Sequence, residues 1–205
     1  MKVLILNGSS KENGNTAIAL QEMEKVFAKE GIEYETIVVG KKAIRGCAAC
    51  GGCAYSGECV VNDIVNDIAL KFREADGLVV ASPVYFGSAN ATLVALLQRL
   101  FYSTHFDKTM KVGASVVCAR RGGCSSAFDE LNKFFTMSGM PVASSNYWNS
   151  IHGLTPGDAK LDEEGRQTMR TLARNMSFLM KSIALGIKTY GMPETEDSVL
   201  TNFIN

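Results

Sequence analysis

The chain has 205 residues, of which 46% are hydrophobic and 20% charged, and this is enough for one substantial buried core. Its 21 Lys and Arg residues balance its 21 Asp and Glu residues, so the net charge gives no reason to expect binding to nucleic acid or to an anionic membrane. The opening MKVLILNGSS is too short an apolar run for a signal peptide, and no later stretch is apolar enough to span a bilayer.

We therefore expect a cytoplasmic protein with one domain over residues 1–205. In a reducing compartment its six cysteines are expected to be thiols or metal ligands rather than disulfides.

Short apolar runs alternate with helical patterns along the chain. Residues 2–6 are an apolar run that stops at an Asn-Gly pair, which is typical of a buried strand, and a helix is expected from about residue 15 until Gly31 ends it. Further strands are predicted over residues 32–39, 77–82 and 112–118 and near Pro141. Four apolar sets at helical spacing lie between and after these strands: Ile64, Ile68 and Phe72; Leu93, Leu96, Leu97, Leu100 and Phe101; Phe128, Leu131 and Phe135; and Met169, Leu172, Met176, Leu179, Met180 and Ile183.

This alternation predicts an α/β protein of the flavodoxin-like doubly wound fold, with a five-stranded parallel sheet and helices on both faces. Two segments fall outside the regular order: a Cys-rich insertion over residues 46–60, after the second strand, and a C-terminal extension over residues 147–205 with a long helix. In the extension, Trp148, Asn149 and His152 are expected either to cover a neighbouring subunit's ligand or to anchor that helix.

Ligands of such sheets bind beyond the carboxyl ends of the strands, where the strand order reverses. The loop after the first strand, NGSSKENGNT over residues 7–16, combines glycines, hydroxyls and a lysine at the start of a helix. This favours a phosphate cradle, although the same residue types also form ordinary turns. A Walker A loop is disfavoured because Asn15 stands where Lys is required, and a G-x-G-x-x-G fingerprint is absent.

The loops after the third and fourth strands add an aromatic and a glycine-rich element. SPVYFGSAN, over residues 82–90, places two aromatic side chains and a glycine at the sheet edge, which suits a flat conjugated ring; the alternative is a turn whose aromatics cover the core. CARRGGCSS, over residues 118–126, has two glycines, and two arginines that would either meet a phosphate or stay in solvent. Together the three loops predict a mononucleotide with a flat ring.

Four of the six cysteines lie in GCAACGGCAYSGECV, residues 46–60, at spacing C-x2-C-x2-C-x5-C: Cys47, Cys50, Cys53 and Cys59. Three thiolates at C-x2-C-x2-C spacing can wrap a cubane iron-sulfur cluster, and a fourth is within easy reach. The spacing leaves three alternatives open: a structural zinc site, a redox pair formed by Cys47 and Cys50, and small buried hydrophobic side chains. Cys118 and Cys124 are expected to be structural.

The stretches MKVLILNGSSKENGNT, SPVYFGSANA, RRGGC and YWNSIHG, at their distances from one another, resemble the NADPH-dependent FMN reductase family within the flavodoxin-like superfamily. The resemblance covers nearly the whole chain and implies a bound FMN. It implies that the FMN phosphate is held by Ser9, Lys11, Asn15 and Thr16. It also implies that the isoalloxazine ring is bordered by Pro83, Val84, Tyr85, Phe86, Gly87, Arg121, Gly122 and Gly123.

The Cys-rich segment further resembles the iron-sulfur flavoprotein branch of this family, whose members hold a [4Fe-4S] cluster on a compact motif of this spacing and form tight homo-oligomers. This resemblance implies a homodimer or homotetramer and a redox partner such as ferredoxin. It also implies four cluster ligands: Cys47, Cys50, Cys53 and Cys59.

The expected function is that of an FMN-dependent oxidoreductase, which transfers electrons between NAD(P)H or a redox partner and a small acceptor such as a flavin or a quinone. Because FMN itself performs this chemistry, no catalytic residue is predicted. One alternative is a cluster-free NAD(P)H-dependent FMN or quinone reductase with structural or redox-switch cysteines. Another is a non-enzymatic module that senses flavin or redox state. A phospho-receiver domain of the same fold is disfavoured, since the first strand is followed by Asn7, Gly8 and Ser9 rather than carboxylates.

Overall fold

The computed structural model describes residues 1–197, 199 and 201. The last part of the predicted C-terminal extension, residues 198, 200 and 202–205, lies outside the described residues. Within the described part, no helix combines the length and apolar character needed to cross a membrane.

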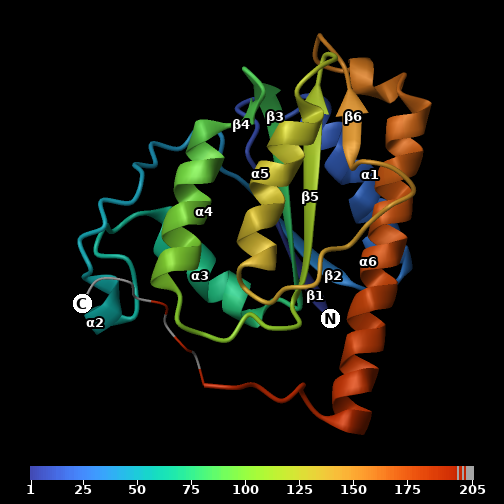
Figure 1. Cartoon of the computed structure of the whole chain (residues 1–205). Helices are drawn as coiled ribbons and strands as arrows, with labels where there is room; N and C mark the ends of the chain where they lie inside the picture. The colour runs from blue at the N-terminus through green and yellow to red at the C-terminus, as the bar shows by residue number, and fades with distance from the viewer. Residues whose placement is uncertain (198, 200, 202–205) are drawn as a thin grey trace.

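A parallel sheet runs through the centre of the molecule (Figure 1). The strand order is β2-β1-β3-β5-β6. This is the flavodoxin-like order, and the predicted fold class is confirmed. The order reverses between β1 and β3, because the chain first moves outward to β2 and then returns past β1. The strands span Lys2–Asn7 (β1), Glu33–Val38 (β2), Gly77–Tyr85 (β3), Val112–Ala119 (β5) and Ser150–His152 (β6).

Helices cover both faces of the sheet (Figure 1). On one face α1 (Asn15–Lys29) and α6 (Glu163–Tyr190) pack on side chains such as Val3 and Ile5. The other face, which includes Leu4 and Leu6, is covered by α3 (Ile64–Glu74), α4 (Ala91–Ser103) and α5 (Cys124–Thr136). Successive residues of β1 thus enter opposite cores, as the alternation of side chains along a strand requires. The remaining elements are short: α2 (Cys53–Ser56), β4 (Ser88–Ala89) and η1 (Asp158–Lys160).

The predicted fifth strand near Pro141 is wrong. At this place the chain makes a single bridge to the sheet, between Val142 and Gly113, and then leaves it. Pro141 lacks an N–H group for a strand ladder, and the polar residues that follow it favour turns. The edge strand is instead β6, where Ile151 is fully buried and pairs with Cys118.

The predicted loop over residues 82–90 is in fact a hairpin. β3 continues to Tyr85, turns at two residues with positive φ, Phe86 at 51° and Gly87 at 79°, and returns as β4. Two consecutive positive φ values give the turn geometry that matches strand twist in two-residue hairpins. The short strand β4 could not be predicted from the sequence, because its two residues, Ser88 and Ala89, are too few to form an alternating pattern.

A buried carboxylate joins α1 to the long α6. Glu22, which is 4% exposed, accepts hydrogen bonds from Lys25 at 2.9 Å, Arg166 at 3.3 Å and Arg170 at 2.5 Å. Burial alone would raise the pKa of Glu22, but the hydrogen bonds and positive charges of these three partners outweigh it and lower that pKa from 4.5 to about 2. Ionised Glu22 therefore stabilises the packing of α6 against α1.

Replacement of Glu22 by Gln is expected to lower the free energy of unfolding at pH 7 by about 3 kcal/mol, the equivalent of the pKa shift. Because the folded-state pKa lies below the unfolded one, this stabilisation is present above pH 4.5 and is lost as the pH falls towards about 2. Urea unfolding of both proteins across this pH range measures the free energy of unfolding, which should fall less steeply with decreasing pH in the variant than in the wild type.

The matched control is Glu30→Gln, which breaks an exposed contact of 2.8 Å to Lys181 between the same two helices and should change stability little. Equal losses for the two variants would contradict the role of Glu22.

Candidate functional site

The loops that follow β1, β3 and β5 meet at the carboxyl edge of the sheet, where they enclose a cavity of about 170 Å³. The structure brings all four predicted phosphate residues and three of the predicted ring residues to this one cavity. Its lining residues are Ser9, Lys11, Gly14, Asn15, Thr16, Pro83, Val84, Tyr85, Cys118, Ala119, Arg120, Gly153, Leu154 and Pro156.

The first loop leaves the start of α1 open. Gly14 is the N-cap residue and has no side chain to cap the first-turn N–H groups of the helix. The loop is held by its own bonds instead: Gly14 N donates to Lys11 O at 3.0 Å, and Lys11 N donates to Ser9 Oγ at 3.1 Å. Gly8 is required at the base of the loop, because a Cβ there would lie 2.9 Å from a Leu93 methyl group. Uncapped N–H groups at a helix N-terminus, next to a lysine, suit a phosphate group.

Asn15 has a structural role that the sequence did not indicate. Its Oδ1 accepts hydrogen bonds from the backbone N–H groups of Gly157 at 3.0 Å and Ala159 at 3.1 Å, and its Nδ2 donates to Thr155 O at 2.9 Å. The side chain therefore ties the segment after β6 to the start of α1. In this geometry the donors that Asn15 keeps for a phosphate are its backbone N–H and the second N–H of Nδ2, since the first is used by Thr155.

The loop after β5 lies against the β3–β4 turn. The Ser126 hydroxyl donates to Gly87 O, and a Cβ on Gly123 would lie 2.9 Å from both Gly87 Cα and Val84 Cγ1. Gly123 also has a φ of 88°. This close approach and the positive φ explain why residue 123 is a glycine.

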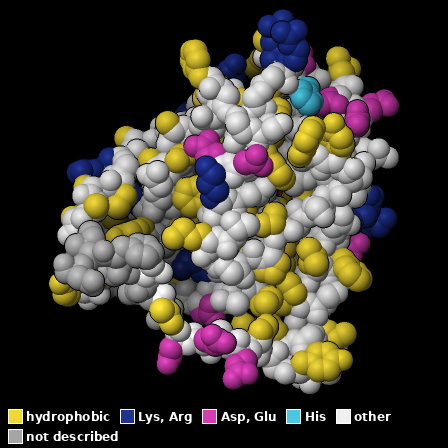
Figure 2. Space-filling view, in the orientation of Figure 1, with side chains coloured by type: hydrophobic (Ala, Val, Ile, Leu, Met, Phe, Trp, Pro, Cys, Tyr) yellow, Lys and Arg dark blue, Asp and Glu magenta, His cyan; other side chains and the backbone are white. Residues whose placement is uncertain are grey.

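The cavity lining does not contain five of the predicted ring residues, which lie in the bordering turns: Phe86, Gly87, Arg121, Gly122 and Gly123. Arg120, rather than its neighbour, reaches the cavity. Both arginines are exposed, and Figure 2 shows positively charged side chains at this end of the molecule, where the strands point.

Two further residues at this end of the sheet, Cys118 and His152, are accounted for by their local surroundings. Burial raises the pKa of the Cys118 thiol to about 12, in spite of a hydrogen bond with Thr16, so this cysteine stays protonated. His152 has Nδ1 3.4 Å from an Asp162 carboxylate oxygen and Nε2 3.9 Å from Cys124 Sγ. Within this chain His152 thus helps to anchor the start of α6, whose N-cap is Asp162.

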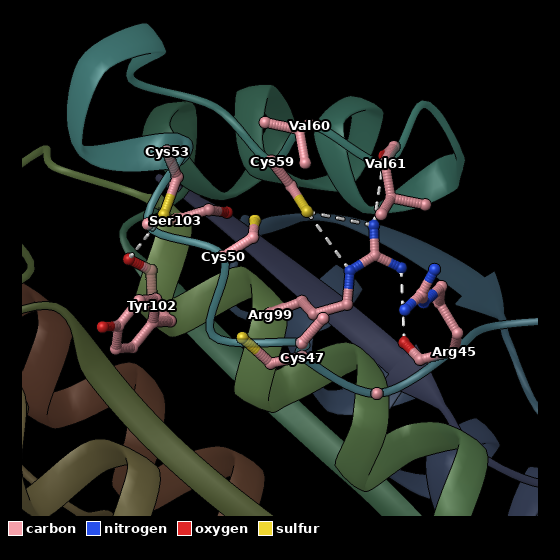
Figure 3. Close-up of a pocket in the computed structure, with 13 residues that line it drawn as sticks. Arg45, Cys47, Cys50, Cys53, Cys59, Val60, Val61, Arg99, Tyr102 and Ser103 are labelled. Carbon is pink, nitrogen blue, oxygen red and sulfur yellow. Dashed lines mark hydrogen bonds between the residues drawn. The ribbon is translucent and has the colours of Figure 1, made fainter.

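The four cysteines of the 46–60 segment line a second cavity, of about 290 Å³, between this segment and α4 (Figure 3). Cys47 and Cys50 are exposed, Cys59 is half-buried and Cys53 is buried. No three His, Cys, Asp or Glu side chains of the described residues converge tightly enough to hold a single metal ion. The cavity is lined by Arg45, Gly46, Cys47, Ala48, Cys50, Gly51, Cys53, Cys59, Val60, Val61, Arg99, Tyr102 and Ser103.

The backbone of the cysteine segment is held by side chains of neighbouring elements. Asn66 of α3 holds Cys59 on both sides: its Oδ1 accepts from Cys59 N at 3.1 Å and its Nδ2 donates to Cys59 O at 2.9 Å. His105 Nε2 lies 3.0 Å from Cys53 O. Gly51, with a φ of 73°, makes a turn that favours glycine, immediately after Cys50.

One wall of this cavity carries Arg99, and its charged pair with Asp63 was not predicted from the sequence. Arg99 of α4 is 1% exposed and donates to the Asp63 carboxylate through Nη1 at 2.6 Å and Nη2 at 3.0 Å. Arg99 Nε and Nη2 also lie 3.3 Å and 3.2 Å from Cys59 Sγ (Figure 3). Burial alone would raise the pKa of Asp63, but the bonds from Arg99 and Val65 N lower it. The signal in the sequence is an arginine among the leucines of the mostly apolar helix ATLVALLQRLFYS.

Comparison with known proteins agrees with this architecture. The chain is 35% identical over 191 residues to an iron-sulfur flavoprotein of Methanocaldococcus jannaschii, covering 89% of this chain and 99% of that protein. It is 31% identical over 187 residues to an iron-sulfur flavoprotein of Methanosarcina thermophila, covering 89% of this chain and 97% of the relative.

A solved structure shares the fold. The crystal structure of RosB with a bound 8-demethyl-8-formylriboflavin-5′-phosphate intermediate aligns with a TM-score of 0.72 at 18% identity, covering 100% of this chain and 92% of RosB.

The family model for NADPH-dependent FMN reductase matches residues 1–155, which include β1, β3 and β5 and the three loops of the carboxyl-edge cavity. The chain therefore belongs to the NADPH-dependent FMN reductase family and is a flavoprotein oxidoreductase.

Proposed function

We propose that this protein is an FMN-dependent oxidoreductase that also holds a [4Fe-4S] cluster, and that it transfers electrons between NAD(P)H or a redox protein and a small acceptor such as a flavin or a quinone. The observation that carries the proposal is that all four cysteines of the C-x2-C-x2-C-x5-C segment line one cavity, in a chain whose carboxyl-edge cavity has a lysine and an uncapped helix N-terminus.

The residues around the cysteine cavity fit an iron-sulfur cluster. Four thiols from a single turning segment supply the ligand set of a cubane cluster. Ser103 also lines the cavity, and its hydroxyl is buried with no hydrogen-bond partner among the described residues. An unpaired buried hydroxyl is costly, and a cluster sulfur atom is an acceptor that would satisfy it. Cys47, Cys50, Cys53 and Cys59 would hold the cluster, which supplies one-electron transfer when bound.

The carboxyl-edge cavity fits the FMN phosphate. The open N-terminus of α1, the Ser9 loop and Lys11 would bind the phosphate, and Asn15 would keep the segment after β6 closed against it. Tyr85 and its neighbours in the β3–β4 hairpin would border the flavin ring, with Arg120 and Arg121 at the mouth of the cavity as a positive surface for a nicotinamide nucleotide phosphate.

A cluster-free reductase is the second candidate, and one observation favours it. Cys47 and Cys50 are both exposed, so they are accessible to oxidants and could form a reversible disulfide. This candidate leaves the shared cavity of the four cysteines and the unpaired Ser103 hydroxyl without explanation.

The phosphate assignment predicts a preference for FMN over riboflavin. Lys11→Ala should lower the affinity of the apoprotein for FMN about tenfold and leave the affinity for riboflavin nearly unchanged, because only FMN carries the phosphate. Fluorescence titration of the apoprotein with each flavin measures both values. Lys29→Ala, at the opposite end of α1, is the control and should alter neither. Equal losses for the two flavins in Lys11→Ala would contradict the assignment.

The cluster assignment predicts about four iron and four sulfide per chain after purification without oxygen. Serine in place of Cys47, Cys50, Cys53 or Cys59 should lower the iron content sharply, because a hydroxyl is a poor ligand for this site. Cys124→Ser, outside the cavity, should retain it. Iron and acid-labile sulfide assays provide the measurement. Wild-type protein that binds FMN but stays free of iron after reconstitution would refute the cluster and favour the second candidate.

We propose a homo-oligomer in which α4 and α5 face a second copy. An apolar groove of about 580 Å³ lies between these helices, with Tyr102 and Met137 exposed along it, and Cys47 lines both the groove and the cysteine cavity. A second copy seated there would cover the exposed edge of the cysteine segment.

The native mass of the protein should therefore be two or four times the chain mass of 22.1 kDa. Met137→Glu should reduce the native mass towards that of the monomer. Light scattering coupled to gel filtration tests this. A monomeric wild-type protein would contradict the proposal.

A further inference from the structure

Arg99 makes more hydrogen bonds beside the cysteine cavity than it would need if it only held α4 against α3. It is among the most completely buried side chains of the molecule, at 1% exposure, and lies on a helix whose other inward side chains are mostly apolar. Burying a guanidinium costs free energy unless all of its donors are satisfied. The partners of Arg99 therefore indicate what this position does.

Most of its donors face oxygen. The Asp63 carboxylate accepts from Nη1 and Nη2, and the carbonyl oxygens of Val61 and Arg45 accept at 3.1 Å and 3.4 Å. These contacts tie α4 to the N-terminus of α3, where Asp63 also caps the helix by accepting from Val65 N at 3.1 Å.

The remaining donor faces sulfur. Among the residues that the structure describes, Nε has no oxygen partner and donates to Cys59 Sγ at 3.3 Å (Figure 3). Nη2, whose two N–H groups also face Asp63 and Val61, lies 3.2 Å from the same sulfur. A neutral thiol is a weak acceptor, whereas a thiolate accepts charge-assisted bonds from a guanidinium. A buried guanidinium that donates from Nε to this sulfur, with Nη2 beside it, is therefore matched to a Cys59 that carries negative charge, as a thiolate bound to iron does.

We propose that Arg99 is a positioning residue that orients the Cys59 thiolate as a cluster ligand and sets the reduction potential of the cluster, with Asp63 as the counter-charge that moderates it. This inference rests on the proposed cluster. Reduction adds one electron, and so one negative charge, to the cluster. The hydrogen bonds and positive charge of Arg99 stabilise the reduced form more than the oxidised form, and the negative charge of Asp63 opposes this.

Opposite shifts in potential are therefore expected from the two members of the pair. Arg99→Gln removes the guanidinium and leaves Asp63, so the midpoint potential of the cluster should become more negative. A tenfold change in the reduced-to-oxidised ratio corresponds to about 59 mV for one electron, and at least this shift is expected. Asp63→Asn keeps a helix-capping side chain and leaves Arg99 uncompensated, so the potential should become more positive.

A redox titration of the anaerobically purified full chain, followed by electron paramagnetic resonance of the reduced cluster, measures these shifts. Iron and sulfide are assayed on the same samples. Glu58→Gln removes one negative charge next to Cys59 but at an exposed position, where solvent screens it, and should shift the potential much less than Asp63→Asn. Arg99→Lys keeps the charge without the planar guanidinium and provides a milder variant if Arg99→Gln loses the cluster.

Shifts of opposite sign for Arg99→Gln and Asp63→Asn support the inference, since simple loosening of the segment gives no reason for opposite signs. Shifts of the same sign, or none, in cluster-containing variants overturn it. A wild-type protein without iron and sulfide would instead refute the proposed cluster, and this result is distinguishable because it precedes any comparison of variants.

Discussion

The structure depends on one topological constraint, the reversal of strand order between β1 and β3. Because all five strands of the β2-β1-β3-β5-β6 order are parallel, the loops after β1, β3 and β5 emerge at the same edge of the sheet. Residues far apart in the chain, Thr16, Tyr85 and Arg120, thereby line one cavity. β2 and β3 lie on opposite sides of β1, so the chain must cross β1 between them. The cysteine segment lies within this crossing and contacts α3 and α4.

The main elements could be predicted from the sequence where a single pattern dominates. Residues 3–6 of β1 and 78–81 of β3 are apolar runs that are buried on both faces, and α1 begins at Asn15, as its apolar spacing indicates. The errors lie where local pattern and tertiary pairing differ. Near Pro141 an apolar run makes only one bridge to the sheet. β6 was missed because it has three residues, too few to show a strand pattern, and is held by its pairing with β5.

The site shows the same division. Loop composition could locate the residues that line the carboxyl-edge cavity and the cysteine motif, because their glycines, hydroxyls and thiols lie close together in the sequence. The role of the Asn15 side chain could not be predicted, since its partners, Thr155, Gly157 and Ala159, are about 140 residues away. Likewise, Arg99 meets Cys59 only after α3 and α4 pack together, so no local pattern contains the pair.

The central claim is that one chain carries both a flavin and an iron-sulfur cluster, held at cavities that share no lining residue. Its most direct test is an anaerobic reductive titration of the purified protein, in which the electrons taken up per chain are counted. Full occupancy by both centres predicts about three electrons, two for the flavin and one for the cluster. An end point at about two electrons, with a flavin spectrum alone, would contradict the account.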